Sequence, residues 1–167
     1  MEIKLLDIGD AERYRELRIQ SLRENPEAFL TTLEIQLAKT IEQVRDNLIP
    51  VNGKFTLGAF ELHELVGMVT FVRESHPKTM HKGNLLAMYV SPEYRGHGIG
   101  KALVQELVSR AAQLDGLEQI NLTVIANNDA AKRLYASVGF EVYGTERNAM
   151  KEGGQYWDDE FMVLRLK

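Results

Sequence analysis

The chain contains no cysteine. It therefore has no disulfide, no thiolate metal site and no cysteine nucleophile, a composition that suits a reducing compartment. Its opening segment, MEIKLLDIGDAERYRELR, has a charge every few residues and no uninterrupted apolar run. We expect neither a signal peptide nor a membrane anchor, and we predict a cytoplasmic protein that binds no membrane and no metal.

Strongly basic stretches are also missing. The 167 residues include 20 Lys and Arg against 24 Asp and Glu, a net charge of -4, so the usual electrostatic source of nucleic-acid binding is absent. Hydrophobic residues make up 44% and charged residues 26% of the chain, as is typical of folded proteins. We expect one domain over residues 1–167 and no nucleic-acid partner.

What the sequence does contain is an alternation of strand-like and helix-like segments. Runs of β-branched and aromatic residues predict strands at 2–8, 54–61, 65–74, 84–90 and 118–126, with two more around the Gly153-Gly154 turn. Apolar residues at helical spacing predict helices at 11–24, 41–48, 98–114 and 127–137. This order predicts an α/β fold with a mixed sheet of about seven strands, about four helices and one parallel crossover.

Local signals give some details of these elements. We expect Asp10 to cap the first helix, and Thr40 with Gln43 to form a capping box for the second. Residues 26–40 have no regular pattern. The nearly continuous apolar run at 84–90 predicts a strand that is buried on both faces.

Three glycines, Gly96, Gly98 and Gly100, occupy alternate positions between this strand and the helix that follows. Such a turn presents backbone N–H groups without intrahelical partners at the positive end of a helix dipole. Residues without side chains let a phosphate approach closely, and Arg95 could add charge-assisted contacts. The turn predicts an anion site; the alternative is a tight turn that binds no ligand.

The spacing of these residues rules out two familiar nucleotide loops. A G-x-G-x-x-G fingerprint fails because Lys101 stands at its third glycine. A P-loop fails because Arg95 stands at its first glycine and Ala102 follows the lysine. The pattern that remains is Arg95-x-x-Gly98-x-Gly100.

This pattern resembles the [QR]-x-x-G-x-[GA] pyrophosphate loop of the GNAT superfamily of acyl-CoA-dependent N-acyltransferases. The resemblance covers about residues 84–140, because a strand, Asn128 and LYASVGF follow in the order of that family. It implies a single α/β (α+β) GNAT-like domain with a mostly antiparallel seven-stranded sheet, in which the fourth and fifth strands run parallel and splay apart. It also implies an N-acetyltransferase that uses acetyl-CoA as co-substrate.

The same resemblance implies which residues bind coenzyme A (CoA). Backbone N–H groups of residues 96–101 would hold the pyrophosphate, and main-chain groups of the fourth strand would pair with the pantetheine and offer an N–H to the oxyanion. The implied set is Met88, Tyr89, Val90, Arg95, Gly96, His97, Gly98, Ile99, Gly100, Lys101 and Asn128. Asn128 is equally suited to cap a helix.

The resemblance places Tyr135 as the general acid that protonates the leaving thiolate. A phenol with a reference pKa of about 10, against about 8.5 for a thiol, is protonated at neutral pH and can donate. The alternative is an aromatic side chain that packs between Ala131 and Val138 on one side of the helix.

The sequence does not identify a general base. Asn84 and Thr123 occupy the two positions where members of the family carry a glutamate, and neither side chain can take up a proton. The candidates are a water chain, His81, Glu64 and the acids of YWDDEF; His81 would otherwise be a solvated loop residue.

The acceptor is expected to be a primary amine: a small amine, an amino compound or a peptide N-terminus. The aromatic and acidic residues 156–160 suggest a cationic acceptor, or else an exposed strand face. Two other functions stay open, a CoA-binding sensor without turnover and a flavin or nucleotide domain. The resemblance also allows a homodimer.

Overall fold

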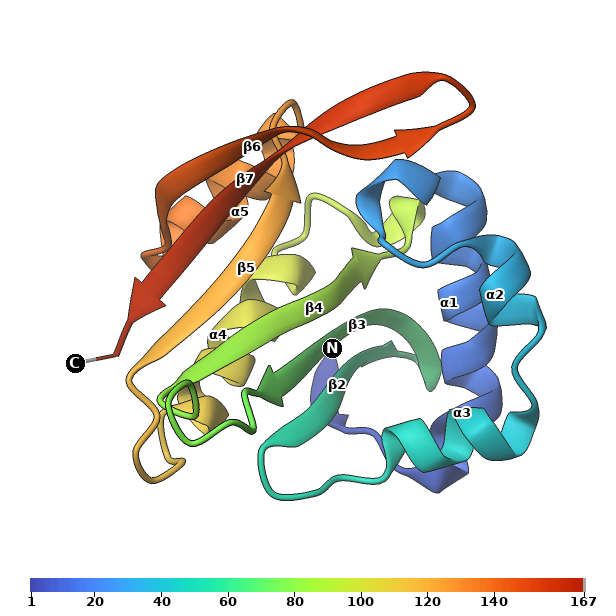
Figure 1. Ribbon diagram of the computed structural model, residues 1–167. Helices are drawn as coiled ribbons and strands as arrows, with labels where there is room; N and C mark the ends of the chain where they lie inside the picture. Colours follow the sequence, from blue (N-terminus) through green and yellow to red (C-terminus); the bar gives the residue numbers. More distant parts are fainter. Residues whose placement is uncertain (167) are drawn as a thin grey trace.

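The computed structural model describes residues 1–166. Figure 1 shows the elements in chain order. The strands are β1 (Glu2–Leu5), β2 (Lys54–Glu61), β3 (Glu64–Arg73), β4 (Lys82–Val90), β5 (Gln119–Ile125), β6 (Glu141–Glu152) and β7 (Gln155–Arg165). The helices are α1 (Ala11–Glu24), α2 (Leu33–Leu37), α3 (Ile41–Leu48), α4 (Ile99–Ala111) and α5 (Asp129–Val138), with 3-10 turns η1 (Ile8–Asp10), η2 (Pro26–Ala28) and η3 (Pro92–Tyr94).

The seven strands form one sheet in the order β1-β2-β3-β4-β5-β7-β6. Only β4 and β5 run parallel; every other neighbouring pair is antiparallel. The pairing of β4 with β5 extends only from Lys82 opposite Gln119 to Asn84 opposite Asn121, after which the two strands separate, as Figure 1 shows. The predicted mixed sheet with a splayed fourth and fifth strand is therefore confirmed.

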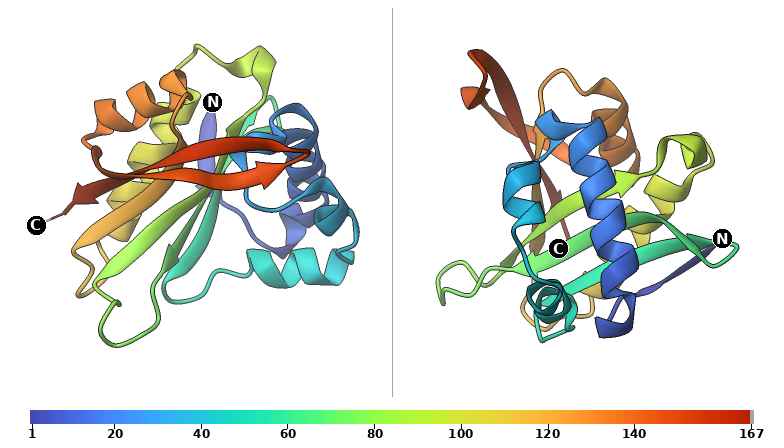
Figure 2. Two further views of the ribbon diagram at one scale, coloured as in Figure 1. Left: turned by 45° about the horizontal axis from the view of Figure 1, so that its top comes forward. Right: turned by 90° about the vertical axis from the view of Figure 1, so that its right-hand side faces the viewer.

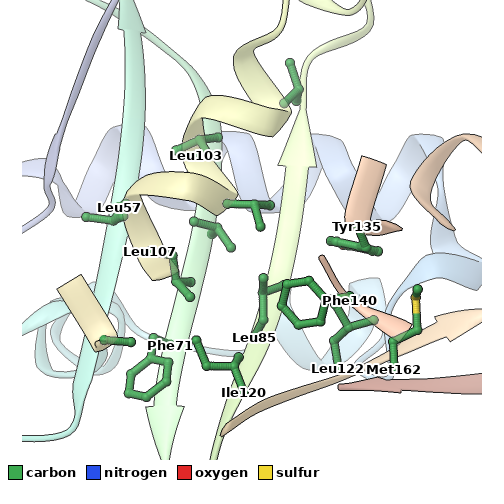
Figure 3. Packing of buried hydrophobic residues seen from close by; sticks show 14 of the residues in the cluster. Leu57, Phe71, Leu85, Leu103, Leu107, Ile120, Leu122, Tyr135, Phe140 and Met162 are labelled. Carbon is green, nitrogen blue, oxygen red and sulfur yellow. The ribbon is translucent and has the colours of Figure 1, made fainter. Parts of the chain in front are cut away.

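Helices cover both faces of the sheet, with α1, α2 and α3 on one side and α4 and α5 on the other (Figure 2). On the second side, Leu103 and Leu107 of α4 are fully buried in a cluster with Phe71 and Ile120 of the sheet (Figure 3). A separate cluster joins α1 and α3 to the opposite face. Strand β4 contributes residues to both hydrophobic clusters and is therefore packed from both faces of the sheet.

The helix starts differ in part from the expected ones. The Thr40 capping box is present, with Gln43 N donating to Thr40 Oγ1 at 3.2 Å and Thr40 N donating to Gln43 Oε1 at 2.9 Å. Asp10 stands at the N-cap position of α1, as predicted, but its side chain makes no capping hydrogen bond to this helix. Its carboxylate instead accepts from Asp7 N at 3.1 Å, because the 3-10 turn η1 precedes the helix and Asp7 caps that turn.

Two further expectations for the chain path need correction. Residues 26–40 are not wholly irregular, since α2 forms there with Thr32 Oγ1 accepting from Ile35 N at 3.2 Å. The predicted helices at 98–114 and 127–137 begin one and two residues later, at Ile99 and Asp129. None of the helices in the described part of the chain is long and apolar enough to cross a bilayer.

The strand β4 is not buried on both faces. Leu86 is 47% exposed, and Ala87 has a positive φ of 55°. The register explains both facts: Met68 faces Tyr89 and Thr70 faces Leu86, so two residues of β4 lie opposite the single Val69 of β3. This β-bulge changes the direction of the backbone and side chains in the middle of β4, beyond the point where β5 has separated from it.

Candidate active site

A cleft of about 1600 Å³ opens where β4 and β5 separate. Its walls are residues 85–90 of β4 and the end of β5. One end is lined by the loop around residues 95–101 and by α5, and the other by residues of α1, α2, α3, β2 and β3. The cleft thus joins the predicted glycine-rich loop to a second compartment beneath the N-terminal helices.

The glycine-rich loop borders open space. Gly96 and Gly98 have φ values of 82° and 81°, and a Cβ built on either would meet no atom within 4 Å. The first helical hydrogen bond of α4 joins Ala102 N to Gly98 O, so the N–H groups of residues 99–101 have no partner inside the helix. The backbone here has the conformation and the free donors that the predicted anion site requires.

Gly100 has a different role from the two glycines before it. A Cβ at this position would lie 2.8 Å from Leu134 Cδ1 and 3.1 Å from Met88 Cε. The absence of a side chain therefore lets α4 pack closely against α5 and β4. Ile99 beside it is buried.

Arg95 is engaged with protein atoms. Its Nε donates to Val90 O at 2.8 Å, its Nη2 donates to Asn25 Oδ1 at 3.2 Å, and its guanidinium lies 5.4 Å from the ring centroid of Tyr89. The side chain thereby ties the loop to the ends of β4 and α1. His97 Nδ1 lies 3.2 Å from Tyr94 O, and Lys101 is exposed at the cleft.

The other predicted residues of β4 form a cleft wall with an unpaired edge. From Leu85 to Val90, β4 has no strand paired on the side of β5, which leaves main-chain groups that could pair with an extended ligand. Tyr89 points its side chain toward α1, where its hydroxyl donates to Glu24 Oε2 at 2.6 Å and accepts from Gln20 Nε2 at 3.2 Å. Burial, reinforced by the bond to Glu24, raises the pKa of Tyr89 to about 12.

The start and the middle of α5 carry the last two predicted residues. Asn128 caps the helix, with its Oδ1 accepting from Ala131 N at 3.2 Å; this confirms the capping role, and contact with pantetheine stays a prediction. Tyr135 lines the cleft, is 7% exposed and packs edge to face with Phe140 at 5.9 Å (Figure 3). Burial raises the pKa of the Tyr135 phenol, which keeps it protonated at neutral pH.

The candidate bases differ in whether they line the cleft. His81 and Glu64 are not among the described residues that line the cleft, whereas Asp159 is. Burial, with the nearby charges of Glu146 and Asp158, raises the pKa of Asp159. The other two acids of YWDDEF have protein partners, since Asp158 Oδ1 accepts from Asn148 N at 2.8 Å and Glu160 pairs with Lys132 at 3.1 Å.

Sequence reasoning missed a polar group at the far end of the cleft. Arg18 and Tyr14 of α1 line it together with Thr56 and Thr70, whose hydroxyl oxygens lie 2.8 Å apart in the buried sheet. The signal was present in the sequence, because Tyr14, Arg18 and Leu22 follow one another at intervals of four. An arginine on the apolar side of a helix faces the interior.

Comparison with known proteins agrees with this geometry. The model of the acetyltransferase (GNAT) family matches residues 14–140, so the chain belongs to the GNAT acetyltransferase family and is an N-acetyltransferase. An L-amino acid N-acetyltransferase of Escherichia coli is 24% identical over 161 residues, which cover 96% of this chain and 95% of that protein.

Two solved structures have the same fold. A GNAT acetyltransferase from Streptococcus pneumoniae has a TM-score of 0.86 at 22% identity, with 98% of each chain covered. A phosphinothricin acetyltransferase from Sinorhizobium meliloti, solved in complex with acetyl-CoA, has a TM-score of 0.82 at 23% identity and covers 98% of this chain and 87% of its own. Within residues 1–166, no group of three or more His, Asp or Glu side chains could hold a metal ion.

The raised pKa of Tyr89 predicts how stability depends on pH. The folded protein keeps this proton up to about pH 12, whereas an unfolded tyrosine loses it near pH 10, so unfolding releases a proton between these values. The contribution of Tyr89 to the free energy of unfolding is full below about pH 10 and is lost as the pH rises through about 12. Urea unfolding across this range should show a smaller decline in Tyr89→Phe than in the wild type. The exposed Tyr156 offers the control Tyr156→Phe; an equal decline in the wild type and Tyr89→Phe would refute the prediction.

Proposed function

We propose that the protein transfers the acetyl group of acetyl-CoA to the primary amine of an amino compound or peptide N-terminus, by direct attack in a ternary complex. The observation that carries the proposal is the cleft between β4 and β5. It brings the open glycine-rich loop, the unpaired edge of β4, Tyr135 and Asp159 into one space.

The residues around the loop fit the donor. Gly96 and Gly98 leave room for phosphate oxygens, and the free N–H groups of residues 99–101 lie at the positive end of α4. Between Met88 and Val90, the main-chain groups that face the β5 side have no partner strand and would bind the pantetheine beside Asn128, except Val90 O, which accepts from Arg95 Nε. The S. meliloti enzyme with the same fold was solved with acetyl-CoA, which supports this assignment.

We expect Gly98→Leu to raise the Kd for CoA at least about tenfold, or about 1.4 kcal/mol, because the new side chain occupies the space left for the phosphates. Gly154→Leu is the matched control, since Gly154 has the same φ of 81°, has no atom within 4 Å of a built Cβ and is not among the residues that line the cleft. Calorimetric titration with CoA measures both variants. An unchanged Kd in Gly98→Leu, or an equal rise in the control, would place the pyrophosphate elsewhere.

The reaction needs two proton movements. The neutral amine attacks the thioester carbonyl carbon, a C–N bond forms and the C–S bond breaks. The nitrogen gives up a proton, and the departing thiolate takes one up. A main-chain N–H near Tyr89 or Val90 stabilises the oxygen charge, and Tyr135 donates the proton to sulfur.

We expect Tyr135→Phe to lower kcat by about 10²- to 10⁴-fold while the Kd for CoA changes little, because the ring still fills its buried position against Phe140. Thiol release with an amine panel measures kcat, and titration measures CoA binding. The exposed Tyr143 provides the control Tyr143→Phe, which should keep wild-type turnover. A wild-type kcat in Tyr135→Phe would exclude the phenol as the acid.

We assign Asp159 as the general base that accepts the proton of the amine. It lines the cleft, and burial and the neighbouring acids raise its pKa above the usual 3.8. A carboxylate of raised pKa is a stronger base than an ordinary one. It offers the function that the side chains of Asn84 and Thr123 cannot supply.

We expect the kcat/KM of the wild-type enzyme to fall at acidic pH as Asp159 takes up its proton, at a pH above the reference value of 3.8. Asp159→Asn should lower kcat/KM at neutral pH and remove this acidic limb of the profile. Asp115→Asn, which changes an exposed acid, is the control. A profile in Asp159→Asn that keeps the wild-type limb would show that another group takes the proton.

The relative named as an L-amino acid N-acetyltransferase supports an amino compound as the acceptor. Thiol release with amino acids, simple amines and short peptides tests the proposal. Tight CoA binding without turnover on any amine would indicate a CoA-binding sensor instead.

A further inference from the structure

The compartment beneath α1 has apolar walls, and its charged lining residues are Arg18, Glu27, Lys39 and Lys54. Val44 and Leu48 of α3, with Val72 and Leu85 of the sheet, form its apolar walls. Arg18 enters this space from α1. A guanidinium in such surroundings needs a partner of opposite charge to offset the loss of water.

Arg18 has no such partner within residues 1–166. Its Nη1 is buried and makes no hydrogen bond, and none of the ion pairs of the described chain includes it. Its neighbour is the ring of Phe29, whose centroid lies 4.7 Å from the guanidinium carbon. Burial accordingly lowers the pKa of the Arg18 guanidinium.

The position of Arg18 connects it to the reacting end of β4. Phe29, beneath the guanidinium, packs edge to face against Tyr89 at 6.4 Å. On the floor, Thr70 faces Leu86, which directly precedes the bulge at Ala87. A ligand held on Arg18 would therefore extend toward the segment of β4 that borders the thioester in the proposed function.

We propose that Arg18 binds the carboxylate of the acceptor, and that the acceptor is an α-amino acid with a free carboxylate and an apolar side chain. This inference rests on the proposed function and names its substrate class. A carboxylate can accept two parallel hydrogen bonds from a guanidinium, and it supplies the missing negative charge. In an α-amino acid one carbon separates the amine from the carboxylate, so both groups fit within the same part of the cleft.

The charge of the whole cleft agrees with an anionic group on the acceptor. Its described lining has six basic residues and two acidic ones: Arg18, Lys39, Lys54, Arg95, Lys101 and Arg133 against Glu27 and Asp159. The loop end would need positive charge for the pyrophosphate, but Arg18 lies on α1, Lys39 lies between α2 and α3, and Lys54 begins β2. This excess argues against the cationic acceptor that residues 156–160 suggested, of which only Asp159 lines the cleft.

The test compares each of three amino acids, L-leucine, L-methionine and L-phenylalanine, with its carboxamide under saturating acetyl-CoA. We expect the wild-type enzyme to have a kcat/KM at least about tenfold higher for a free acid than for its amide, because only the acid pairs with Arg18. Arg18→Met should abolish this preference by raising the KM for the acid, with the KM for acetyl-CoA unchanged. Arg18→Lys, which keeps the charge, should retain part of it.

Arg15 provides the matched control on the same helix. Its Nε is also buried without a hydrogen-bond partner, but Arg15 is not among the residues that line the cleft. Arg15→Met should therefore leave the ratio of kcat/KM for the acid to kcat/KM for the amide unchanged. Equal turnover of acids and amides by the wild type, or a ratio that survives Arg18→Met, would overturn the inference while leaving the N-acetyltransferase proposal intact.

If no amine is acetylated although acetyl-CoA binds, the proposed function fails, and the carboxylate site is then tested by binding alone. The three amino acids are titrated calorimetrically into wild type and Arg18→Met saturated with CoA. Binding by the wild type that Arg18→Met loses would support the carboxylate site. Absence of binding, or equal binding by both proteins, would overturn it.

Discussion

The separation of β4 from β5 after three residue pairs is the constraint on which the site depends. A parallel pair that continued to Val90 would satisfy the main-chain groups of β4 and close the cleft. The sheet tolerates the separation because β3 still pairs with the other edge of β4 and because α4 packs against the strands through Leu103 and Leu107. The main-chain groups left free on β4 are then available to a ligand.

Two sets of contacts hold the free part of β4 in place. At its end, Arg95 bonds to Val90 O and reaches Asn25 at the end of α1. One residue earlier in the strand, the Tyr89 hydroxyl donates to Glu24 on the same helix. Both connect β4 to α1, so the wall that would carry the acyl group and the helix that carries Arg18 form one structural unit. The geometry between donor and acceptor therefore depends on contacts outside the glycine-rich loop.

The two ends of the cleft differ in how they offer positive potential. The loop end uses backbone N–H groups and a helix terminus, which suit a phosphate because they surround it without bulky side chains. The α1 end offers the guanidinium of Arg18, whose Nη1 is buried without a hydrogen-bond partner and which suits a planar carboxylate. Tyr135 and Asp159, whose pKa values burial raises, lie along the same cleft. In the proposed reaction, the loop end would bind the acyl donor and the α1 end would bind the acceptor.

The sequence alone determined the order of the strands and of every helix except α2, the capping box at Thr40 and the glycine-rich turn, because each depends on residues a few positions apart. Through a family resemblance, the sequence also predicted Asn128 as a CoA-binding residue and Tyr135 as the general acid. Only the tertiary structure decided that the Asp10 side chain makes no capping bond to α1, that β4 bulges at Ala87, that Asp159 rather than His81 lines the cleft, and that Arg18 enters it. These features depend on which distant elements pack together, and local periodicity does not encode that information.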